Sequence, residues 1–402
     1  MPHKRHGEPV KILFLTSRLP YPPYGGDKLR VFNFIKYLSA RHAIHLLSFI
    51  ESEEEKKYLG ELGKYCARIE TVLLKPADSY AKCLLLSPTA VPFQVAYYKE
   101  GRMRDKADSM MSSEKYDGIY VHLLRMAQYA RGRKDERRVL DLTDSLSLSL
   151  YRSLKYRKHV FYLFYLVEWL KVRRYEPEAV RSFDRSLLIS DADLRSEKAL
   201  ASEKSISIIP NGVDLGYFSP SPKGYDDNKI VFIGNLHSFP NRDAVLYFYG
   251  KIFPAVKRAR PGAVFYIVGS NPPEKIKKLA DGRSVFVTGP VEDTRVHLGD
   301  AAALVCPIRA ATGMQNKVME AMAMGLPVVS TTISTQWMQA GRETGVLMSD
   351  SPESFAGNVV RVMEDRPLRE RLSLMSRRYA EENFNWENNI RDLEKIFEGG
   401  IK

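Results

Sequence analysis

One segment of the chain combines residue types that could bind a nucleotide and its phosphates. It runs from Cys306 to Ser330 and reads CPIRAATGMQNKVMEAMAMGLPVVS. A short apolar strand is expected to end at Pro307, followed by a loop that carries Arg309 and Gly313. Because glycine lacks a Cβ, Gly313 lets the main chain approach a phosphate or a sugar closely.

A helix is expected to follow over about 316–324. Its first backbone N–H groups form an anion site, and Lys317 and Arg309 add the positive charge that a diphosphate requires. Asn316 and Glu320 are four residues apart and share a helix face, where the carboxylate can accept two hydrogen bonds from ribose hydroxyls. The candidate donor-binding residues here are Gly313, Met314, Gln315, Asn316 and Glu320, with Arg309 and Lys317 as catalytic cations.

The elements around this segment predict an α/β protein. Apolar runs typical of strands alternate with helical stretches, which favours parallel sheets covered on both faces. In the first half, strands are expected at 11–16, 45–50, 71–74, 118–121, 138–142, 186–190 and 206–209. A second series is expected at 229–234, 263–269, 284–288, 303–306 and 327–330.

A linker separates the two series at 219–224, which reads SPSPKG. The sequence therefore predicts two Rossmann-like, doubly wound domains facing across a cleft, with ligand at the carboxyl ends of the strands. A length of 402 residues also suits two domains.

The segment before the first strand lacks an apolar stretch of signal-peptide length, and the three cysteines form no Cys-x-x-Cys pair. Both features favour a cytoplasmic protein with free thiols.

Positive charge is concentrated in the first half of the chain. Residues 1–210 hold 37 Lys and Arg against 26 Asp and Glu, whereas 211–402 hold 24 against 22. Within the basic half, residues 151–175 carry seven cations and one acid around the aromatic run 160–167. This composition suits an interfacial helix on an anionic membrane, although a core helix with solvated ends explains it equally well. Nucleic acid is not expected, since no recognition motif accompanies the charge.

Three acidic positions have competing interpretations. Asp144 follows a predicted strand and could face an acceptor, but it could also cap the next helix. Asp191-Ala-Asp193 has the spacing of a metal-binding pair, yet it follows a strand and opens a charged helix, so capping is favoured. We expect no obligatory metal.

Neither domain-opening strand is followed by Gly-x-Gly-x-x-Gly, which argues against a dehydrogenase.

The segment 306–330 resembles the donor-binding motif of family-4 retaining glycosyltransferases of the GT-B fold (glycosyl transferases group 1). That motif has two glutamates eight apart, ahead of Ala-Met-Ala-x-Gly-x-Pro-Val-Val; Glu320 matches the second and Thr312 replaces the first. The likeness extends to Gly25-Gly26 after the first strand, to IPNGVD at 209–214 and to Phe384-Asn-Trp386 before a last helix.

The resemblance implies an N-terminal acceptor domain over 1–218 and a donor domain over 219–383. A last helix at about 384–402 would pack back on the first domain. It implies that Gly25 and Gly26 contact the donor phosphate and that Asp27 lies beside the acceptor. An ordinary turn with Asp27 as helix N-cap explains the same residues.

The resemblance also implies a role for His122, which follows a strand where the family often has a histidine near the transferred sugar. A structural histidine is the alternative. Gly234 and Asn235 follow the first strand of the second domain, but the basic pair that the family often has there is missing. Arg309 and Lys317 are expected to replace that pair. The resemblance implies front-face attack, with the departing phosphate taking the proton of the acceptor.

The expected reaction moves a sugar from a nucleotide sugar to a glycan or polyprenyl-linked acceptor in bacterial exopolysaccharide synthesis. No cofactor or metal is expected beyond the nucleotide-sugar co-substrate. Met126-Ala-Gln-Tyr129 and Gly313-x-Gln315-Asn-Lys317 resemble a branch found beside PEP-CTERM/exosortase genes. An inactive relative that binds nucleotide or glycan as a scaffold is the alternative, supported by Thr312 at a glutamate position.

Overall fold

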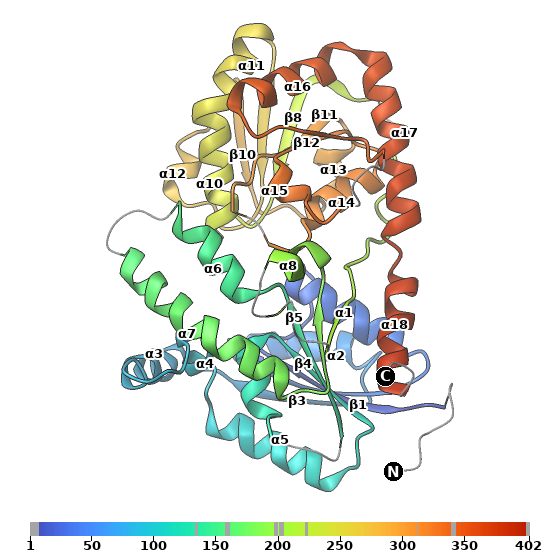
Figure 1. The fold of residues 1–402 in the computed structure, drawn as a ribbon. Coiled ribbons are helices and arrows are strands. Elements are labelled where there is room, and N and C mark those ends of the chain that lie inside the picture. Colours follow the sequence, from blue (N-terminus) through green and yellow to red (C-terminus); the bar gives the residue numbers. More distant parts are fainter. Residues whose placement is uncertain are drawn as a thin grey trace. The chain divides into compact units, whose positions relative to one another are not determined.

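The chain divides into two compact units in this computed structural model (Figure 1). Unit 1 comprises Met1–Pro210 and Glu387–Lys402, and unit 2 comprises Asn211–Trp386. The division thus lies at Pro210, ahead of the proline-containing linker at which the sequence analysis places it. The structure describes residues 8–132, 136–156, 161–196, 200, 205–221, 224–310, 312–338 and 343–398.

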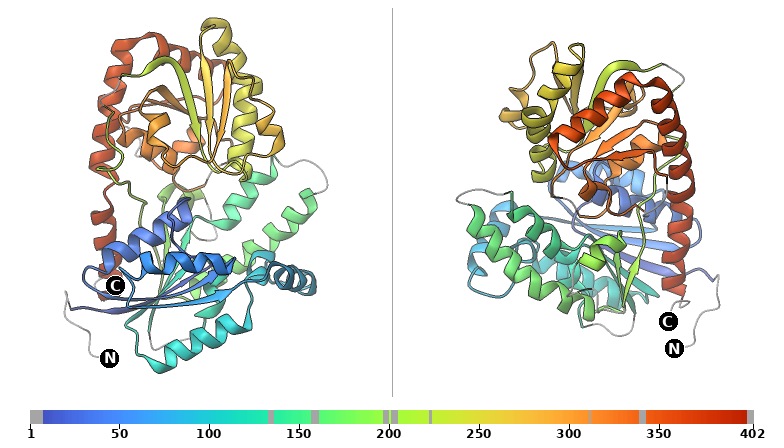
Figure 2. Two further views of the ribbon diagram at one scale, coloured as in Figure 1. Left: turned by 180° about the vertical axis from the view of Figure 1, so that it is seen from behind. Right: turned by 45° about the horizontal axis from the view of Figure 1, so that its top comes forward.

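Unit 1 is built on a parallel sheet of seven strands in the order β3-β2-β1-β4-β5-β6-β7. The strands are β1 (Lys11–Thr16), β2 (Ala43–Ile50), β3 (Arg68–Leu73), β4 (Gly118–His122), β5 (Arg137–Thr143), β6 (Arg185–Leu188) and β7 (Ile206–Ile208). Almost every residue of β1, β2 and β4 is buried, with no alternation of exposed side chains. Helices therefore cover both faces of this sheet; α1 and α5 lie on opposite faces (Figures 1 and 2).

The helices of unit 1 include a final one contributed by the end of the chain. They are α1 (Gly26–Leu38), α2 (Leu59–Leu62), α3 (Pro76–Leu85), α4 (Phe93–Tyr97), α5 (Gly101–Ser113), α6 (Leu146–Leu154), α7 (Phe161–Arg181), α8 (Asp191–Ser196) and α18 (Trp386–Glu398). Two 3-10 helices are η1 (Glu53–Tyr58) and η2 (Leu124–Tyr129). Helix α18 packs so closely on β4 that a Cβ on Gly118 would collide with the ring of Phe397.

Unit 2 repeats the arrangement with a parallel sheet of six strands in the order β10-β9-β8-β11-β12-β13. The strands are β8 (Asp226–Ile233), β9 (Val264–Val268), β10 (Val285–Gly289), β11 (Ala301–Cys306), β12 (Val328–Ser330) and β13 (Val346–Met348). The helices are α10 (Phe239–Tyr247), η3 (Phe248–Ile252), α11 (Phe253–Ala259), α12 (Glu274–Lys277), α13 (Arg295–Leu298), α14 (Asn316–Ala323), α15 (Thr332–Thr335), α16 (Pro352–Glu364) and α17 (Arg366–Asn383).

Of the thirteen strands in the described residues, twelve lie within three residues of their predicted positions. The exception is β13, which is only three residues long, with two half-buried residues and one exposed residue. The stretch 151–175, predicted as one helix, contains the end of α6 and the start of α7. The two basic residues Arg157 and Lys158 lie outside the described residues.

Candidate functional site

The loop between β1 and α1 lies at the carboxyl edge of the unit 1 sheet. There β1 and β4 are neighbours that are followed by connections to opposite halves of the sheet, which is where doubly wound proteins bind ligands. Gly25 is the N-cap of α1 with a φ of 95°, a left-handed conformation that glycine adopts without strain. The helix begins at Gly26, so the interpretation of Asp27 as the N-cap is wrong: the chain enters the helix through Gly25, and Asp27 lies in the first turn.

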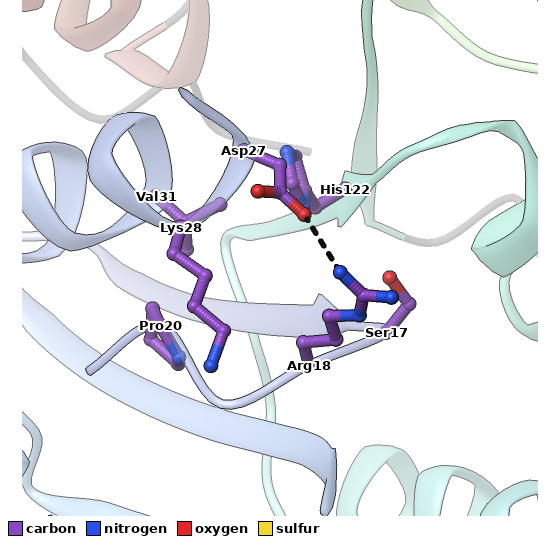
Figure 3. A pocket seen from close by; sticks show the side chains of 7 residues that line it. All are labelled: Ser17, Arg18, Pro20, Asp27, Lys28, Val31 and His122. Atoms are coloured by element: carbon purple, nitrogen blue, oxygen red, sulfur yellow. Dashed lines mark ion pairs between the residues drawn. The ribbon is translucent and has the colours of Figure 1, made fainter. Parts of the chain in front are cut away.

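A small pocket lies beside this loop, and Figure 3 shows the side chains that line it: Ser17, Arg18, Pro20, Asp27, Lys28, Val31 and His122. Arg18 NH1 is 3.8 Å from Asp27 Oδ2, and Arg18 Nε is 3.3 Å from Glu51 Oε1. Burial disfavours the ionised form of Asp27, but His122, Arg18 and Arg125 outweigh it and lower the pKa of that carboxyl group. Asp27 is therefore an anion in this pocket at neutral pH.

His122 is the last residue of β4, and its side chain reaches the same pocket as Asp27. Burial lowers the pKa of His122 to about 4, against the opposing effect of Asp141 and Asp27. The imidazole is therefore neutral at pH 7. Its Nε2 is 3.4 Å from Thr143 Oγ1, and its ring stacks on Tyr120. The structure thus brings together two of the predicted unit 1 residues, His122 and Asp27.

A fully buried ion pair underlies this edge of the sheet. Arg30 Nε is 2.6 Å from Asp141 Oδ2, and both side chains are 0% exposed. Asp141 also accepts hydrogen bonds from the Tyr120 hydroxyl and from the Thr143 N–H at 2.8 Å. Arg30 NH1 donates to the Ile209 carbonyl at 2.9 Å. These bonds tie α1, β4, β5 and the end of unit 1 together beneath the pocket.

Asp144 follows β5 and does not cap α6. The N-cap is Ser145, whose side chain accepts a hydrogen bond from the Leu148 N–H at 3.2 Å. Glu176 of α7 binds the same helix start, accepting from the Leu146 N–H at 2.7 Å. The capping alternative for Asp144 is therefore wrong, because Ser145 and Glu176 already occupy the first turn of α6.

Asp191 and Asp193 lie in the first turn of α8, which begins at Asp191, so neither is the residue that precedes the helix and caps it. The Asp193 carboxylate is buried and lies 3.3 Å from Arg152 NH1, while Asp191 pairs with Arg195. Over the described ranges of the chain, no group of three or more His, Cys, Asp or Glu side chains is arranged to hold a metal ion.

In unit 2 the corresponding edge lies at the ends of β8 and β11, which are neighbours in the sheet. Gly234 and Asn235 follow β8 in a tightly packed turn. A Cβ on Gly234 would lie 2.7 Å from Asn241 Nδ2, and a Cβ on Gly269 would collide with the Gly234 carbonyl. The Asn235 carbonyl accepts from Asn241 Nδ2 at 2.9 Å. A side chain at residue 234 would therefore disturb the turn that leads into α10.

The loop after β11 approaches α14 through Gly313, whose φ of 63° is in the left-handed region. Gln315 is the N-cap, and its side chain makes no hydrogen bond to the first turn of the helix. Asn316 opens α14 and accepts a hydrogen bond at 3.2 Å from Asn211, in the segment that precedes β8. Met314 packs against the core of unit 2. The predicted residues 313–316 thus form the entry to one helix.

On α14, Lys317 is buried and Glu320 is half-buried. Lys317 is 9% exposed; its Nζ is 2.7 Å from Asn241 Oδ1 and 5.0 Å from the centre of the Phe232 ring. Burial lowers the pKa of Lys317, and burial raises the pKa of Glu320 to about 7 against the opposing charge of Lys317. Glu320 therefore changes its charge near neutral pH.

Arg309 has a carboxylate partner in this structure. Its NH2 lies 2.6 Å from Asp243 Oδ1 and its Nε lies 2.9 Å from Asp243 Oδ2, while its guanidinium stacks 4.3 Å from the centre of the Tyr247 ring. Helix α10 thus supplies a partner for each proposed cation, Asn241 for Lys317 and Asp243 for Arg309. Lys317 meets a neutral amide, so its charge is the more available of the two.

Several residues of these two edges were missed by the sequence analysis. Asn241 and Asp243 are more than sixty positions before their partners, and no spacing in the sequence connects them. Arg18 and Arg125 follow β1 and β4, and they come together only because those strands are neighbours in the sheet. A comparison of the residues that follow each predicted strand could have identified Arg18 and Arg125.

Residues 227–365 match the protein family described as Glycosyl transferases group 1. The chain also resembles an uncharacterised 44.6 kDa protein in the cps region of Klebsiella pneumoniae. The two are 20% identical over 410 residues, which cover 98% of this chain and 99% of the relative. The matched family segment starts in β8 and includes α14, so it contains both edge segments of unit 2.

Two solved structures share the fold over nearly their whole length. Anabaena Alr3699/HepE, solved in complex with UDP and glucose, superposes with a TM-score of 0.69 at 15% identity and covers 97% of this chain and 100% of its own. Sucrose-phosphate synthase from Thermosynechococcus elongatus gives a TM-score of 0.72 at 15% identity, over 97% and 98% of the two chains. The match over 227–365 and the fold of the two sheets together identify the chain as a glycosyltransferase with the GT-B fold.

Proposed function

We propose that this enzyme is a retaining glycosyltransferase that moves a sugar from a nucleotide-sugar donor to a glycan or polyprenyl-linked acceptor in bacterial exopolysaccharide synthesis. The observation that carries the proposal is the entry to α14, where Gly313 of the preceding loop and Lys317 and Glu320 of the helix lie at the carboxyl edge of the unit 2 sheet. The relative in a cps region supports a role in surface polysaccharide. The PEP-CTERM-associated branch is a narrower form of the same proposal.

In this proposal unit 2 binds the donor. The Glu320 carboxylate accepts hydrogen bonds from the two ribose hydroxyls, and Lys317 offsets the charge of the diphosphate. The backbone N–H groups at the start of α14 stabilise the same anion, since the Gln315 side chain leaves them uncapped. Arg309 also binds the phosphate, while it keeps its ion pair with Asp243.

Unit 1 binds the acceptor in this proposal, with His122 and Asp27 at its pocket and with Gly25 and Gly26 at the start of α1. His122 is neutral at pH 7, so its imidazole can donate a hydrogen bond to a sugar hydroxyl or accept one from it. Attack occurs on the face from which the diphosphate departs, and the departing phosphate takes the proton of the acceptor hydroxyl. No metal takes part: the α14 N–H groups, Lys317 and Arg309 stabilise the leaving group.

A thermal-shift screen of the purified chain with UDP-, GDP- and ADP-sugars tests the donor assignment. We expect one nucleotide to stabilise the protein by several degrees, and slow hydrolysis of that nucleotide sugar in the absence of acceptor. Binding without any hydrolysis or transfer, even with added membrane extract as acceptor source, would instead support a scaffold in which Thr312 has cost the enzyme its activity. Failure of every nucleotide to bind would refute both versions.

A second part of the proposal concerns the membrane. Apolar side chains are unusually exposed on α3 and on the first half of α7, which lie near each other in unit 1 (Figures 1 and 2). Lys171 of α7 donates to the Ser87 carbonyl just after α3 at 2.8 Å. The exposed residues are Tyr80 (67%), Leu84 (77%), Leu85 (76%), Phe161 (70%), Tyr162 (40%), Leu163 (70%), Phe164 (47%), Val167 (41%) and Leu170 (48%). We name these nine residues the α3–α7 surface.

Cations adjoin the α3–α7 surface, and Arg173 and Arg174 are exposed on α7 one turn beyond Leu170. No helix in the described part of the chain has the length and hydrophobicity to span a bilayer. We therefore propose that unit 1 binds an anionic membrane peripherally, with its aromatic and leucine side chains among the headgroups and its cations at the lipid phosphates. The interfacial interpretation of 151–175 is thus favoured over a core helix, because a core helix would not expose Phe161 and Leu163.

Liposome co-sedimentation tests the membrane proposal. We expect the wild-type chain to bind vesicles containing phosphatidylglycerol and to bind phosphatidylcholine vesicles weakly. Replacing Leu84, Leu85 and Leu163 with serine should release the protein, as should glutamine at Arg173 and Arg174. Leu374→Ser is the matched control, since Leu374 is 75% exposed on α17 of unit 2. Equal binding of the triple variant and the control would refute the assignment of this surface.

A further inference from the structure

Arg125 is a partly buried cation held by neutral groups. Its Nε is 3.1 Å from Ser17 Oγ, its NH1 is 3.3 Å from Gln94 Oε1, and its guanidinium lies 5.0 Å from the centre of the Tyr98 ring. Throughout the described residues, no carboxylate lies within ion-pair distance of Arg125. Burial lowers the pKa of Arg125, and the nearby Arg18 adds to this effect against the opposing influence of Tyr98, Asp27 and Glu51, so keeping the charge here costs free energy.

Two further cations surround the adjoining pocket. Arg18 lines it and divides its charge between Asp27 and Glu51, at 3.8 and 3.3 Å. Lys28 lines the same pocket from α1, and Figure 3 shows its side chain extending toward the loop that carries Pro20 and Arg18. Within the described ranges Lys28 has no ion pair. Three cations thus face two carboxylates at the carboxyl edge of the unit 1 sheet, where a positive field attracts anions.

The position of Arg125 is fixed by the surrounding structure. Gln94, which accepts from Arg125, has its own N–H bound by Glu168 at 3.0 Å. The Arg125 carbonyl accepts a hydrogen bond from Gln128 Nε2 at 2.9 Å. Ser17, at the end of β1, completes the set. A guanidinium that is held in one place by neutral hydrogen-bond partners is preorganised for an anion, because little side-chain entropy remains to be lost.

We propose that Arg18, Lys28 and Arg125 bind an anionic group of the acceptor, a phosphate or a carboxylate close to the hydroxyl that is glycosylated. The inference rests on the proposed function, since it assumes that unit 1 receives the acceptor. It narrows the acceptor class to phosphorylated or uronic-acid-containing molecules, and it makes these three cations determinants of acceptor specificity.

Calorimetry on the full chain tests this assignment with small probes. Glycerol 3-phosphate and glucuronate represent the two anions, and glycerol and glucose are their neutral counterparts. Each titration is run without UDP and again with UDP at saturation, so that in the second case a site that recognises the donor diphosphate is already occupied. The variants are Arg125→Gln and Lys28→Gln, and Lys36→Gln is the control because Lys36 is an exposed cation on the same helix.

We expect one of the two anions to bind in the presence of UDP while its neutral counterpart does not. Each of the two variants should weaken that binding by about tenfold, and Lys36→Gln should leave it unchanged. Preference for glycerol 3-phosphate or for glucuronate then identifies the anion. Lys28 has no ion pair to lose, so Lys28→Gln should keep the wild-type unfolding temperature and remains informative if Arg125→Gln folds poorly.

Three outcomes would overturn the inference: equal binding of anionic and neutral probes, wild-type affinity in both variants, or loss of all anion binding when UDP is present. The last would assign the cations to the donor phosphates. Affinity for UDP and for UDP-glucose, measured on the same samples, reports separately on the proposed function. Anion binding by a chain that binds no nucleotide would refute the proposed function, whereas nucleotide binding without an anion site would refute only the present inference.

Discussion

The ionisation of Glu320 should control donor affinity near neutral pH. Burial raises the pKa of this carboxyl group to about 7, so about 9% of it is ionised at pH 6 and about 91% at pH 8. If the ribose hydroxyls bind the carboxylate form, affinity for the donor should increase about tenfold between these two pH values. His122 remains neutral over this range, because burial lowers its pKa to about 4.

The assay is calorimetry with UDP-glucose, or with whichever nucleotide sugar the thermal-shift screen selects. A nucleotide sugar is preferable to UDP because its diphosphate carries no group that titrates between pH 6 and 8. Glu320→Gln is the decisive variant: it keeps the shape and one acceptor oxygen but cannot ionise. Its affinity should be independent of pH and no higher than that of the wild type at pH 6.

The same pKa shift has a consequence for stability. The pKa of Glu320 rises on folding from 4.5 to about 7, so the folded state binds more protons between these values. Its contribution to stability is therefore lost as pH rises through this window, and Glu320→Gln should remove that part of the pH dependence. The reasoning would be refuted if wild-type donor affinity were equal at pH 6 and pH 8, or if the glutamine variant kept the tenfold increase.

Further predictions concern the cations, the metal and the buried ion pair. Lys317→Ala should reduce turnover by about a hundredfold, and Arg309→Ala should have a smaller effect because Asp243 already shares its charge; wild-type turnover in both would refute the diphosphate assignment. Activity should survive EDTA, and loss with recovery on adding manganese would show a metal requirement. Arg30→Met should destabilise unit 1 by about 3–5 kcal/mol in urea unfolding, since it leaves Asp141 buried without its cation. Adding Asp141→Asn should recover much of that loss; no recovery would contradict this explanation.

The sequence was most informative where a local pattern determines structure. The apolar runs of β1, β8 and β11 are nearly continuous because both faces of each strand are covered, so their positions could be predicted closely. Helix α14 could be located from the strand before it and the glycine and proline after it. Strand β13 could not, since it has only three residues, two half-buried and one exposed, and carries no such pattern.

The candidate site was predictable residue by residue but not as a set of partners. Gly313, Lys317 and Glu320 follow one another closely enough for their types and spacing to indicate a common role. The pairing of Arg309 with Asp243 depends on how α10 packs beside the end of β11, which no local pattern specifies. For the same reason the contact between Arg125 and Ser17 could not be predicted, because it depends on the order of the strands in the sheet.

The end of the chain belongs to unit 1, and this constrains the order in which the two units can fold. The segment 387–402 belongs to unit 1, yet the ribosome synthesises it only after all of unit 2. Until then the space over Gly118 that the Phe397 ring occupies is empty, and the face of β4 beneath it is uncovered. Unit 2 is continuous in sequence and can complete its core first, so the half of the protein that is translated earlier finishes folding later. A tag or truncation at the C-terminus therefore acts on the fold of the N-terminal half.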